Sequence, residues 1–488
     1  MNAQIYNIFF SLFIISNVYT QTEELEEAKN KLINDSSLKN ATFSICVRDL
    51  STGNNVCTHQ EQISMSAAST TKLFATASAL EILGENYIPN TTLYSENKID
   101  ESGVLNGNIW IRGSGDASLG SKYFNKNGEE YQFLQNWVDT LYAMGLRKIN
   151  GSIIGDGSDF SYFGAPDGWN WGDLGNYYGT APCGLPIFDN VLRCFFNVPA
   201  KIGEKAVLIK TFPEIPQLNF NSYIYSANIK GDDSYIYGAP FSYDRFSSGY
   251  LPKNSSSFMV RGSLPDPEQQ FADAFKKALI EKGIFVYGES KGARNMNLVQ
   301  ASKRYAVLFP LYQHKGRGVK QIVHWTNMRS VNLFAEQLVL WIAKEKTGFG
   351  DTDSGIKYIK RFWSNHFNTS GFYIKDGSGL SRTNAINTSI FCSLLEYMHK
   401  SINSTIFYES LPITGVSGTL NSVCKGQIAE GKIHAKSGTL NKVKSYAGYV
   451  ETISGKKLAF SIIFNNYSCS NEAMMNKIEQ FMNAMVLY

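Results

Sequence analysis

The chain is 488 residues long, and its 46 Lys and Arg against 42 Asp and Glu leave a formal charge of only +4. An apolar content of 43% supports packed cores and excludes a disordered or collagen-like chain. Nucleic-acid-binding proteins usually carry a clustered basic surface, so no nucleic-acid partner is expected. The length fits about three domains, or one domain with large insertions.

The N-terminus predicts export. Residues 5–19 form an apolar run that is too short and too interrupted for a membrane span. We therefore predict a signal peptide over residues 1–20, although no Lys or Arg precedes Lys29. The mature protein is then secreted, periplasmic or in the cell envelope. A buried N-terminal helix is the alternative, but residues 23–30 continue as a separate amphipathic surface helix.

The seven cysteines fit an exported protein, and their spacing contains no CxxC pair and no zinc-finger pattern. Cys46 and Cys57 flank a turn between two strand-like runs, where a cross-strand disulfide is a candidate. Cys183 and Cys194 are a second local candidate. The state of the remaining cysteines stays open: Cys392, Cys424 and Cys469.

The predicted secondary structure changes in character once within the first 300 residues. Residues 43–60 alternate as a β-hairpin, and residues 66–80 pass from small hydroxyl side chains into an apolar helix. From about residue 86 to residue 300, strand-like runs, glycines and aromatic clusters dominate. Few long helical patterns occur there apart from residues 267–283.

Helix and strand patterns return after residue 320. Residues 326–344 predict one long helix, with apolar side chains at helical spacing. Residues 433–453 and 458–465 predict antiparallel strands, and residues 471–487 predict a closing amphipathic helix.

This order predicts an α+β fold in which one domain carries a strand-rich insertion. The outer domain, helices around an antiparallel sheet, is assigned to residues 21–85 and 301–488. The insertion spans residues 86–300. Two nested subdomains are predicted within it, residues 86–195 with 285–300, and residues 196–284.

Two common catalytic patterns carry little weight. The six histidines form no HExxH motif, so metalloprotease chemistry is unsupported. Residues 288–292 match G-x-S-x-G, but a poor helix follows, whereas a nucleophile elbow needs a strand, a turn and a helix. A surface turn is the better interpretation.

A serine three residues before a lysine is a stronger candidate. On one helical face, a desolvated lysine can take the proton of the serine hydroxyl. The pattern occurs at Ser36, Ser69, Ser95, Ser354, Ser422 and Ser454. Only Ser69, with Lys72, opens a helix of small and apolar residues. A helix-capping serine followed by a solvated lysine would give the same local pattern.

Two further segments complete a known signature. Ser330-Val331-Asn332 begins a helical pattern, and Lys436-Ser437-Gly438-Thr439 begins a strand-like run. A helix cap and a hairpin turn would explain each by itself. Together with Ser69, their order matches the S-x-x-K, S-x-N and K-[ST]-G motifs of penicillin-binding proteins and serine β-lactamases.

The chain resembles peptidase family S13, the class C low-molecular-mass penicillin-binding proteins with D-alanyl-D-alanine carboxypeptidase and endopeptidase activity. Further segments carry the resemblance across nearly the whole mature chain: Arg112-Gly113-Ser114-Gly115-Asp116, Gly262-Ser263-Leu264-Pro265-Asp266-Pro267 and Asp376-Gly377-Ser378-Gly379-Leu380-Ser381-Arg382. The long gap between Lys72 and Ser330 is typical of this family, whose serine β-lactamase-like transpeptidase domain carries nested insertions. Val331 stands where the family commonly has Asp.

The resemblance and the chemistry imply the catalytic roles. Ser69 attacks the carbonyl between two D-alanines to form an acyl-enzyme, and Lys72 is the base. Ser330 passes a proton to the leaving amine, and Asn332 hydrogen-bonds Lys72 or the substrate amide. The backbone N–H groups of Ser69 and Thr439 form the oxyanion hole.

The resemblance also implies the substrate contacts. Lys436 supplies positive potential, and the hydroxyls of Ser437 and Thr439 hold the terminal carboxylate. The side chain of the stem peptide's diamino acid is expected to meet Asp173, Tyr178, Arg382 and Asn441, where a carboxylate and a guanidinium suit a zwitterionic end. For Asp173 and Tyr178, a turn with packed aromatics is the alternative.

The expected partners are peptidoglycan stem peptides, either ending in D-Ala-D-Ala or cross-linked through D-Ala, and β-lactams as covalent inhibitors. Membrane-surface or cell-wall association is a further option, and no metal or organic cofactor is needed. Two other functions remain as alternatives, a secreted serine β-lactamase and a non-catalytic peptidoglycan-binding scaffold. The residues do not separate carboxypeptidase from endopeptidase activity.

Overall fold

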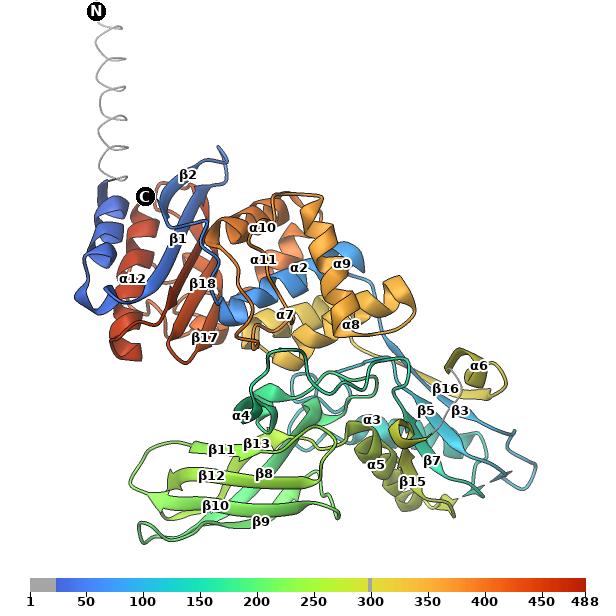
Figure 1. Cartoon of the computed structure of the whole chain (residues 1–488). Helices are drawn as coiled ribbons and strands as arrows, with labels where there is room; N and C mark the ends of the chain where they lie inside the picture. The colour runs from blue at the N-terminus through green and yellow to red at the C-terminus, as the bar shows by residue number, and fades with distance from the viewer. Residues whose placement is uncertain (1–22, 297–300) are drawn as a thin grey trace, which may run out of the picture. The chain divides into compact units, whose positions relative to one another are not determined.

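The structure is a computed structural model that describes residues 23–296 and 301–488. The predicted signal peptide lies outside the described residues. The chain forms two compact units (Figure 1). Of the described residues, the first unit holds those from residue 23 to Glu81 together with Val323–Ser330 and Ile359–Tyr488. The second unit holds the described residues between Ile82 and Ile322, together with Val331–Tyr358. The boundaries assigned from sequence, at residues 85, 300 and 301, remain a prediction.

An antiparallel five-stranded sheet forms the centre of the first unit, in the order β17-β18-β19-β1-β2. Its strands are β1 (Thr42–Asp49), β2 (Asn55–His59), β17 (Ile433–Leu440), β18 (Val443–Glu451) and β19 (Lys457–Asn465). The strands β18 and β19 are buried along most of their length. Such continuous burial requires cover on both faces of a sheet.

Helices supply that cover (Figure 1). On one face, α12 (Asn471–Leu487) and a helix over residues 23–33 share an apolar core with the sheet. On the other face, α10 (Thr388–Lys400) packs on β1 and β19. The helix α2 (Lys72–Ile82) is buried from Lys72 to Leu80. A helix buried on all sides lies in the centre of its unit. The short helix α11 (Ser404–Ser410) packs against α10.

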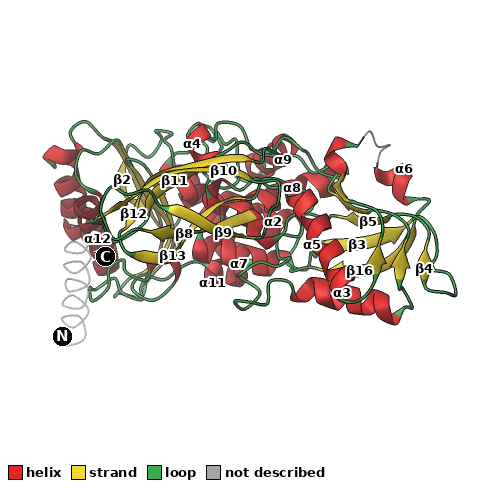
Figure 2. Cartoon of the chain, turned by 90° about the horizontal axis from the view of Figure 1, so that it is seen from below, coloured by secondary structure: helices red, strands yellow, loops and turns green. Residues whose placement is uncertain are grey.

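The second unit contains a mixed five-stranded sheet, in the order β15-β7-β5-β3-β16. Its strands are β3 (Asn90–Ser95), β5 (Ile109–Arg112), β7 (Ile153–Asp156), β15 (Ser290–Gly292) and β16 (Phe309–Lys315). The helices α3 (Gln132–Ala143) and α5 (Pro267–Glu281) pack against each other and against this sheet (Figure 2). A small sheet beside it joins β4 (Val104–Leu105), β6 (Lys148–Ile149) and β14 (Phe285–Val286).

A β-sandwich makes up the rest of the insertion. One sheet has the order β13-β8-β9 and the other β10-β12-β11. The strands are β8 (Val191–Val198), β9 (Val207–Phe212), β10 (Asn219–Ala227), β11 (Asp233–Tyr237), β12 (Asp244–Pro252) and β13 (Ser255–Ser263). Ile224, Ile236 and Leu251 from one sheet share a core with Phe196 and Val260 from the other. Alternate side chains therefore face solvent.

Five further helices lie in the described part of the chain: α4 (Trp171–Leu174), α6 (Ala301–Tyr305), α7 (Val319–Arg329), α8 (Asn332–Thr347) and α9 (Thr352–Ser364). The fold is α+β, as predicted. The hairpin, the helix at 267–283, the strands after residue 433 and the last helix are confirmed. The single helix predicted over residues 326–344 is wrong, because the chain breaks at Ser330 between α7 and α8.

The cross-strand disulfide between Cys46 and Cys57 is not formed. Cys46 lies opposite Thr58, and Cys57 lies opposite Val47. Because neighbouring residues of a strand point to opposite faces, this offset by one residue separates the two sulfur atoms. All seven cysteines are free thiols, so the candidate bond between Cys183 and Cys194 is absent as well.

No helix in the described part of the chain is both long and apolar enough to cross a bilayer.

A buried carboxyl in the second unit predicts a pH-dependent stability. Burial, and then the neighbouring carboxylate of Asp266, raise the pKa of Glu268 to about 8, against hydrogen bonds from Gly157 and Tyr162. The contribution of this group to the free energy of unfolding is at most about 5 kcal/mol. It is fully present below pH 4.5 and is lost as the pH rises through about 8. We expect Glu268→Gln to flatten the loss of thermal stability between pH 5 and pH 8.

Thermal unfolding at both pH values checks this expectation, with Glu281→Gln at the exposed end of the same helix as control. The control is expected to keep the wild-type slope. Equal slopes for all three proteins would show that Glu268 does not titrate in this range.

Candidate active site

Ser69 and Lys72 lie at the start of the buried helix of the first unit. Ser69 belongs to a 3₁₀ turn over Ala68–Thr71, and Lys72 begins α2. Residues three apart lie above one another in such a turn, and Nζ of Lys72 donates to Oγ of Ser69 at 2.9 Å. Lys72 has no exposed surface, whereas Ser69 is partly exposed. A capping serine with a solvated lysine therefore does not describe this pair.

A backbone carbonyl holds the same lysine. Nζ of Lys72 also donates to the carbonyl oxygen of Ser378 at 2.6 Å. The loop that carries Ser378 folds around the buried Asp376 carboxylate, which accepts from the backbone N–H of Gly379 at 2.9 Å. Gly379 has a φ of 81°, and a Cβ there would lie 1.9 Å from the carbonyl oxygen of Ala68. Glycine thus permits the close approach of loop and turn.

The strand β17 passes beside the nucleophile turn. A Cβ at Gly438 would lie 2.9 Å from the backbone nitrogen of Ser69 and 2.7 Å from the carbonyl oxygen of Ala67. The hydroxyl of Ser445 on β18 donates to that carbonyl at 2.6 Å. The sheet therefore fixes the backbone N–H of Ser69 in place, and glycine is needed at position 438 for steric reasons.

Lys436 is a second fully buried lysine in this group. Its Nζ donates to Oγ of Ser330 at 2.9 Å and to the carbonyl oxygen of Ser437 at 2.7 Å. Burial, and then the positive charge of Lys72, lower the pKa of Lys436 well below its ordinary value. Two buried ammonium groups would repel each other, and this repulsion favours the neutral form of Lys436.

Ser330 has a strained backbone. Its φ of 57° lies in the left-handed region that non-glycine residues rarely adopt. The residue forms the break between α7 and α8, and this turn brings its hydroxyl to Lys436. Strain of this kind is often retained at functional sites, where the surroundings hold it.

The other predicted residues of the first unit lie on β17, in the turn after it and in the loop that begins at Asp376. Oγ of Ser437 lies 2.8 Å from Oγ1 of Thr419, so its orientation is fixed by a neighbour. Thr439 is exposed near the end of β17, and Asn441 is exposed in the turn that follows. Arg382 is exposed in the loop that begins at Asp376.

Three predicted residues belong to the second unit: Asn332, Asp173 and Tyr178. Asn332 begins α8, and its Nδ2 donates to the carbonyl oxygen of Tyr178 at 2.7 Å. Asp173 lies in α4, and Tyr178 lies in the 3₁₀ turn that follows. Burial, and then the charge of Asp173, raise the pKa of Tyr178, so its hydroxyl stays protonated. This unit brings the three residues to one place.

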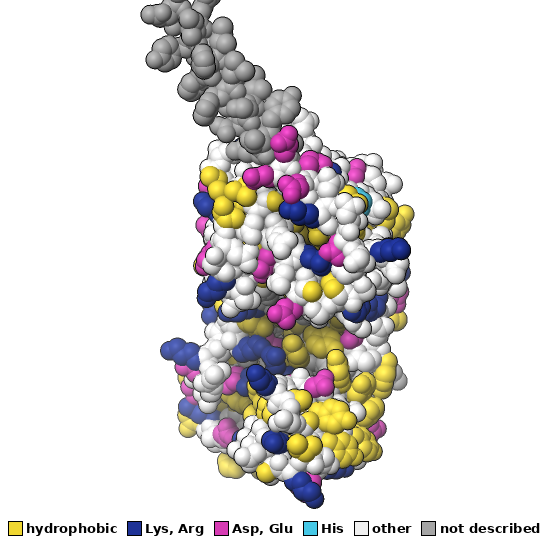
Figure 3. All heavy atoms as spheres, turned by 90° about the vertical axis from the view of Figure 1, so that its left-hand side faces the viewer, with side chains coloured by type: hydrophobic (Ala, Val, Ile, Leu, Met, Phe, Trp, Pro, Cys, Tyr) yellow, Lys and Arg dark blue, Asp and Glu magenta, His cyan; other side chains and the backbone are white. Residues whose placement is uncertain are grey.

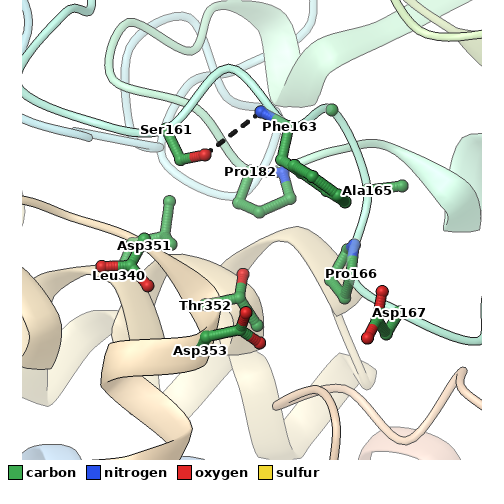
Figure 4. A pocket seen from close by; sticks show the side chains of 11 residues that line it. Ser161, Phe163, Ala165, Pro166, Asp167, Pro182, Leu340, Asp351, Thr352 and Asp353 are labelled. Atoms are coloured by element: carbon green, nitrogen blue, oxygen red, sulfur yellow. Dashed lines mark hydrogen bonds between the residues drawn. The ribbon is translucent and has the colours of Figure 1, made fainter.

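Two other candidate positions in the described chain lack a serine–lysine hydrogen bond like that between Ser69 and Lys72. Ser290 of the G-x-S-x-G segment lies in β15, and its hydroxyl bonds the carboxylate of Asp273. A separate hollow of about 140 Å³ in the second unit is lined by Phe163, Asp167 and Asp353 among others (Figure 4). Its lining contains serine and aspartate but no lysine or histidine that could activate a nucleophile.

Replacement of Gly438 by alanine is expected to slow acylation of the protein by benzylpenicillin. The new Cβ would displace β17 or the Ser69 turn and so misplace the N–H donors beside the nucleophile. In other enzymes, loss of one such donor lowers kcat by about 10²–10³-fold. Stopped-flow acylation measures the rate, and Gly231→Ala, where a Cβ meets nothing within 4 Å, is the control. An unchanged rate in Gly438→Ala would contradict the steric argument.

Residues 25–486 match the D-Ala-D-Ala carboxypeptidase 3 (S13) family. A D-alanyl-D-alanine carboxypeptidase of Actinomadura sp. (strain R39) is 26% identical over 461 residues, 91% of this chain and 81% of that protein. The D-alanyl-D-alanine carboxypeptidase DacB of Haemophilus influenzae is 25% identical over 473 residues, 95% of this chain and 91% of that protein. Penicillin binding protein 4 of H. influenzae shares the fold, with a TM-score of 0.78, 21% identity and coverage of 94% of this chain and 98% of that chain. The chain therefore belongs to the S13 family of D-Ala-D-Ala carboxypeptidases and is a hydrolase.

Proposed function

We propose that Ser69 is the nucleophile with which this chain cleaves the D-Ala-D-Ala bond of peptidoglycan stem peptides. The observation that carries the proposal is the hydrogen bond from the buried Lys72 to the hydroxyl of the partly exposed Ser69. A serine is a weak nucleophile by itself and needs an adjacent base. A carboxypeptidase releases the last D-alanine, and an endopeptidase cuts the cross-link after a D-alanine by the same chemistry.

Acylation follows from the contacts of the pair. Neutral Lys72 takes the proton of Ser69 as Oγ attacks the carbonyl carbon between the two D-alanines. The tetrahedral intermediate collapses, the bond to the leaving amine breaks, and the amine receives a proton through Ser330. Water then hydrolyses the acyl-enzyme in a second step.

The proposal gives the two buried lysines different roles. Lys436 meets the terminal carboxylate of the substrate, whose opposite charge favours the protonated form of that lysine. Lys72, which donates to Oγ of Ser69, acts as the base. The hydroxyls of Ser437 and Thr439 hold the same carboxylate.

The oxyanion is held by backbone N–H groups. The N–H of Ser69 lies against Gly438, and the N–H of Thr439 follows one residue later on β17. Donors held rigidly by a sheet stabilise the charge that develops on the substrate oxygen without rearrangement.

Five residues are proposed to recognise the rest of the substrate. Asn332 hydrogen-bonds the peptide amide. Asp173, Tyr178, Arg382 and Asn441 meet the diamino acid of the stem, where Asp173 suits an ammonium group and Arg382 suits a carboxylate. This substrate also implies a secreted, periplasmic or cell-envelope location, and β-lactams as covalent inhibitors.

Release of D-alanine from a peptide ending in D-Ala-D-Ala tests the proposal, with benzylpenicillin hydrolysis measured in parallel. We expect D-alanine release and a lasting penicillin adduct. Rapid penicillin hydrolysis without a lasting adduct would identify a β-lactamase instead. If the protein carries out neither reaction, the non-catalytic peptidoglycan-binding scaffold is the remaining function.

A further inference from the structure

One face of the sheet β10-β12-β11 carries a set of aromatic side chains, here called the aromatic platform: Tyr223, Tyr225, Tyr235, Tyr237, Phe246 and Tyr250. Paired residues of neighbouring strands share a face, and Tyr225 pairs with Tyr250 while Tyr237 pairs with Phe246. The opposite face is buried in the sandwich, and Ile224, Ile236 and Leu251 lie there.

The rings are open to solvent. Tyr223 is 51% exposed, Tyr235 48% and Tyr250 51%. Phe246 stacks on Tyr237 at 4.8 Å between ring centroids and meets Tyr223 edge-on at 6.5 Å. Hydrophobic side chains gather on one side of the second unit (Figure 3). Exposed apolar groups in such a continuous array usually mark a binding surface.

One end of the platform is hollowed. A cavity of about 560 Å³, in the size range of small-ligand sites, is lined by Trp171, Tyr223, Tyr237 and Phe246. Two side-chain amides, Asn219 and Asn221, stand among these rings. Each amide can both donate and accept hydrogen bonds. The end therefore offers flat apolar surfaces beside neutral polar groups.

The floor of this end is held rigidly. Nη1 of the buried Arg245 donates to the carbonyl oxygens of Ala239 at 3.1 Å and Ser242 at 2.6 Å, which fixes the turn before β12. A preformed site loses less conformational freedom when a ligand binds.

The charges of this face indicate the class of ligand. Asp233 and Asp244 are exposed on it, and Nδ2 of Asn219 donates to Asp244 at 2.9 Å. The cation of Lys205 lies over the ring of Tyr223 at 5.3 Å from its centroid. Without an excess of positive charge, the face suits neither a nucleic acid nor an anionic membrane. A neutral ligand with apolar faces and polar edges fits it.

We propose that the aromatic platform binds the glycan strand of peptidoglycan, a β-1,4-linked chain of N-acetylated hexosamines. The C–H faces of the sugar rings stack on the aromatic rings, and their acetamido and hydroxyl groups bond Asn219 and Asn221. The inference rests on the proposed function, because a stem peptide substrate brings its glycan with it.

The chain connects the two sites. Trp171, which lines the cavity, and Asp173, proposed to meet the third residue of the stem, belong to the same short helix α4. In peptidoglycan two residues separate that diamino acid from the sugar, about 10 Å of extended chain with their linkage. A glycan on the platform is therefore within reach of a stem peptide at Asp173.

Binding of an N-acetylglucosamine hexamer and of peptide-free glycan strands, measured by calorimetry, tests the inference. Wild type is compared with Tyr223→Ala/Phe246→Ala, and the matched control is Tyr287→Ala, a 70% exposed tyrosine outside the platform. We expect the double variant to bind at least about tenfold more weakly, since two stacked rings are lost. The control is expected to bind as wild type does.

Benzylpenicillin acylation of the same proteins separates this inference from the proposed function. All three proteins are expected to acylate at equal rates. No glycan binding by an acylating wild type, or equal binding by all three proteins, would overturn the platform and leave the peptidase intact. If wild type forms dimers that the double variant loses, the occupant of the platform is a second copy of the chain. If wild type binds vesicles and the double variant does not, the occupant is a membrane. Either result would overturn the glycan inference.

Discussion

Ser69→Ala is expected to lower kcat for D-alanine release by at least about 10⁴-fold, because removal of the nucleophile closes the acyl-enzyme route. The substitution removes one partly exposed hydroxyl, and its contact in the site is the bond from Lys72. The fold is therefore expected to keep its thermal stability. D-alanine release with a coupled amino-acid oxidase measures kcat.

The chain offers a matched control for this change. Ser422 has the same spacing to Lys425, but it is exposed and lies outside the site. Ser422→Ala is expected to keep wild-type activity. Comparable activity in Ser69→Ala and wild type would remove Ser69 from the mechanism, whatever the stability of the variant.

Lys72→Met is expected to slow acylation by about 10²–10⁴-fold, the usual contribution of a general base. Methionine keeps much of the volume of the buried side chain but cannot accept a proton. The substitution also leaves the carbonyl oxygen of Ser378 without the bond from Nζ of Lys72. Some loss of stability is therefore expected alongside the loss of rate.

A substrate-binding measurement separates the two effects. The dissociation constant of the D-Ala-D-Ala peptide, measured with Ser69→Ala and with Lys72→Met, is expected to change much less than the acylation rate. Lys425→Met serves as control at the matched position. A Lys72→Met protein that binds substrate and acylates at the wild-type rate would show that another group is the base.

Short contiguous motifs were predictable because each combines a fixed spacing with a local backbone form. Ser69 lies in a 3₁₀ turn that leads directly into Lys72 at the start of α2, and Lys436 to Thr439 share one strand. The terminal helix was equally clear, because its apolar periodicity is uninterrupted and Ser470 caps it by accepting from the N–H of Ala473.

Features set by backbone and tertiary contacts were not predictable in the same way. Ser330 could be recognised as the start of a helical pattern, but the apolar periodicity of residues 326–344 does not reveal its left-handed backbone. The carbonyl of Ser378 binds Lys72 without any side-chain signal. The helix α3 did have a signal, since Phe133, Trp137 and Leu141 recur every four residues, but the surrounding strand-rich texture hid it.

Register explains the error over the cysteines. Cys46 and Cys57 flank a tight turn, and a shift of one residue in the pairing would place them opposite each other. The bulge between Val47 and Arg48 instead sets the two on opposite faces. A bulge inserts one unpaired residue and is invisible in the alternation of a short strand.

The central claim is that Ser69 forms the acyl-enzyme, and intact-mass spectrometry after incubation with benzylpenicillin, followed by peptide mapping, tests it most directly. We expect one penicilloyl adduct on wild type and on Ser422→Ala, located at Ser69, and none on Ser69→Ala. An adduct that persists in Ser69→Ala, or that maps to another residue of wild type, would contradict it.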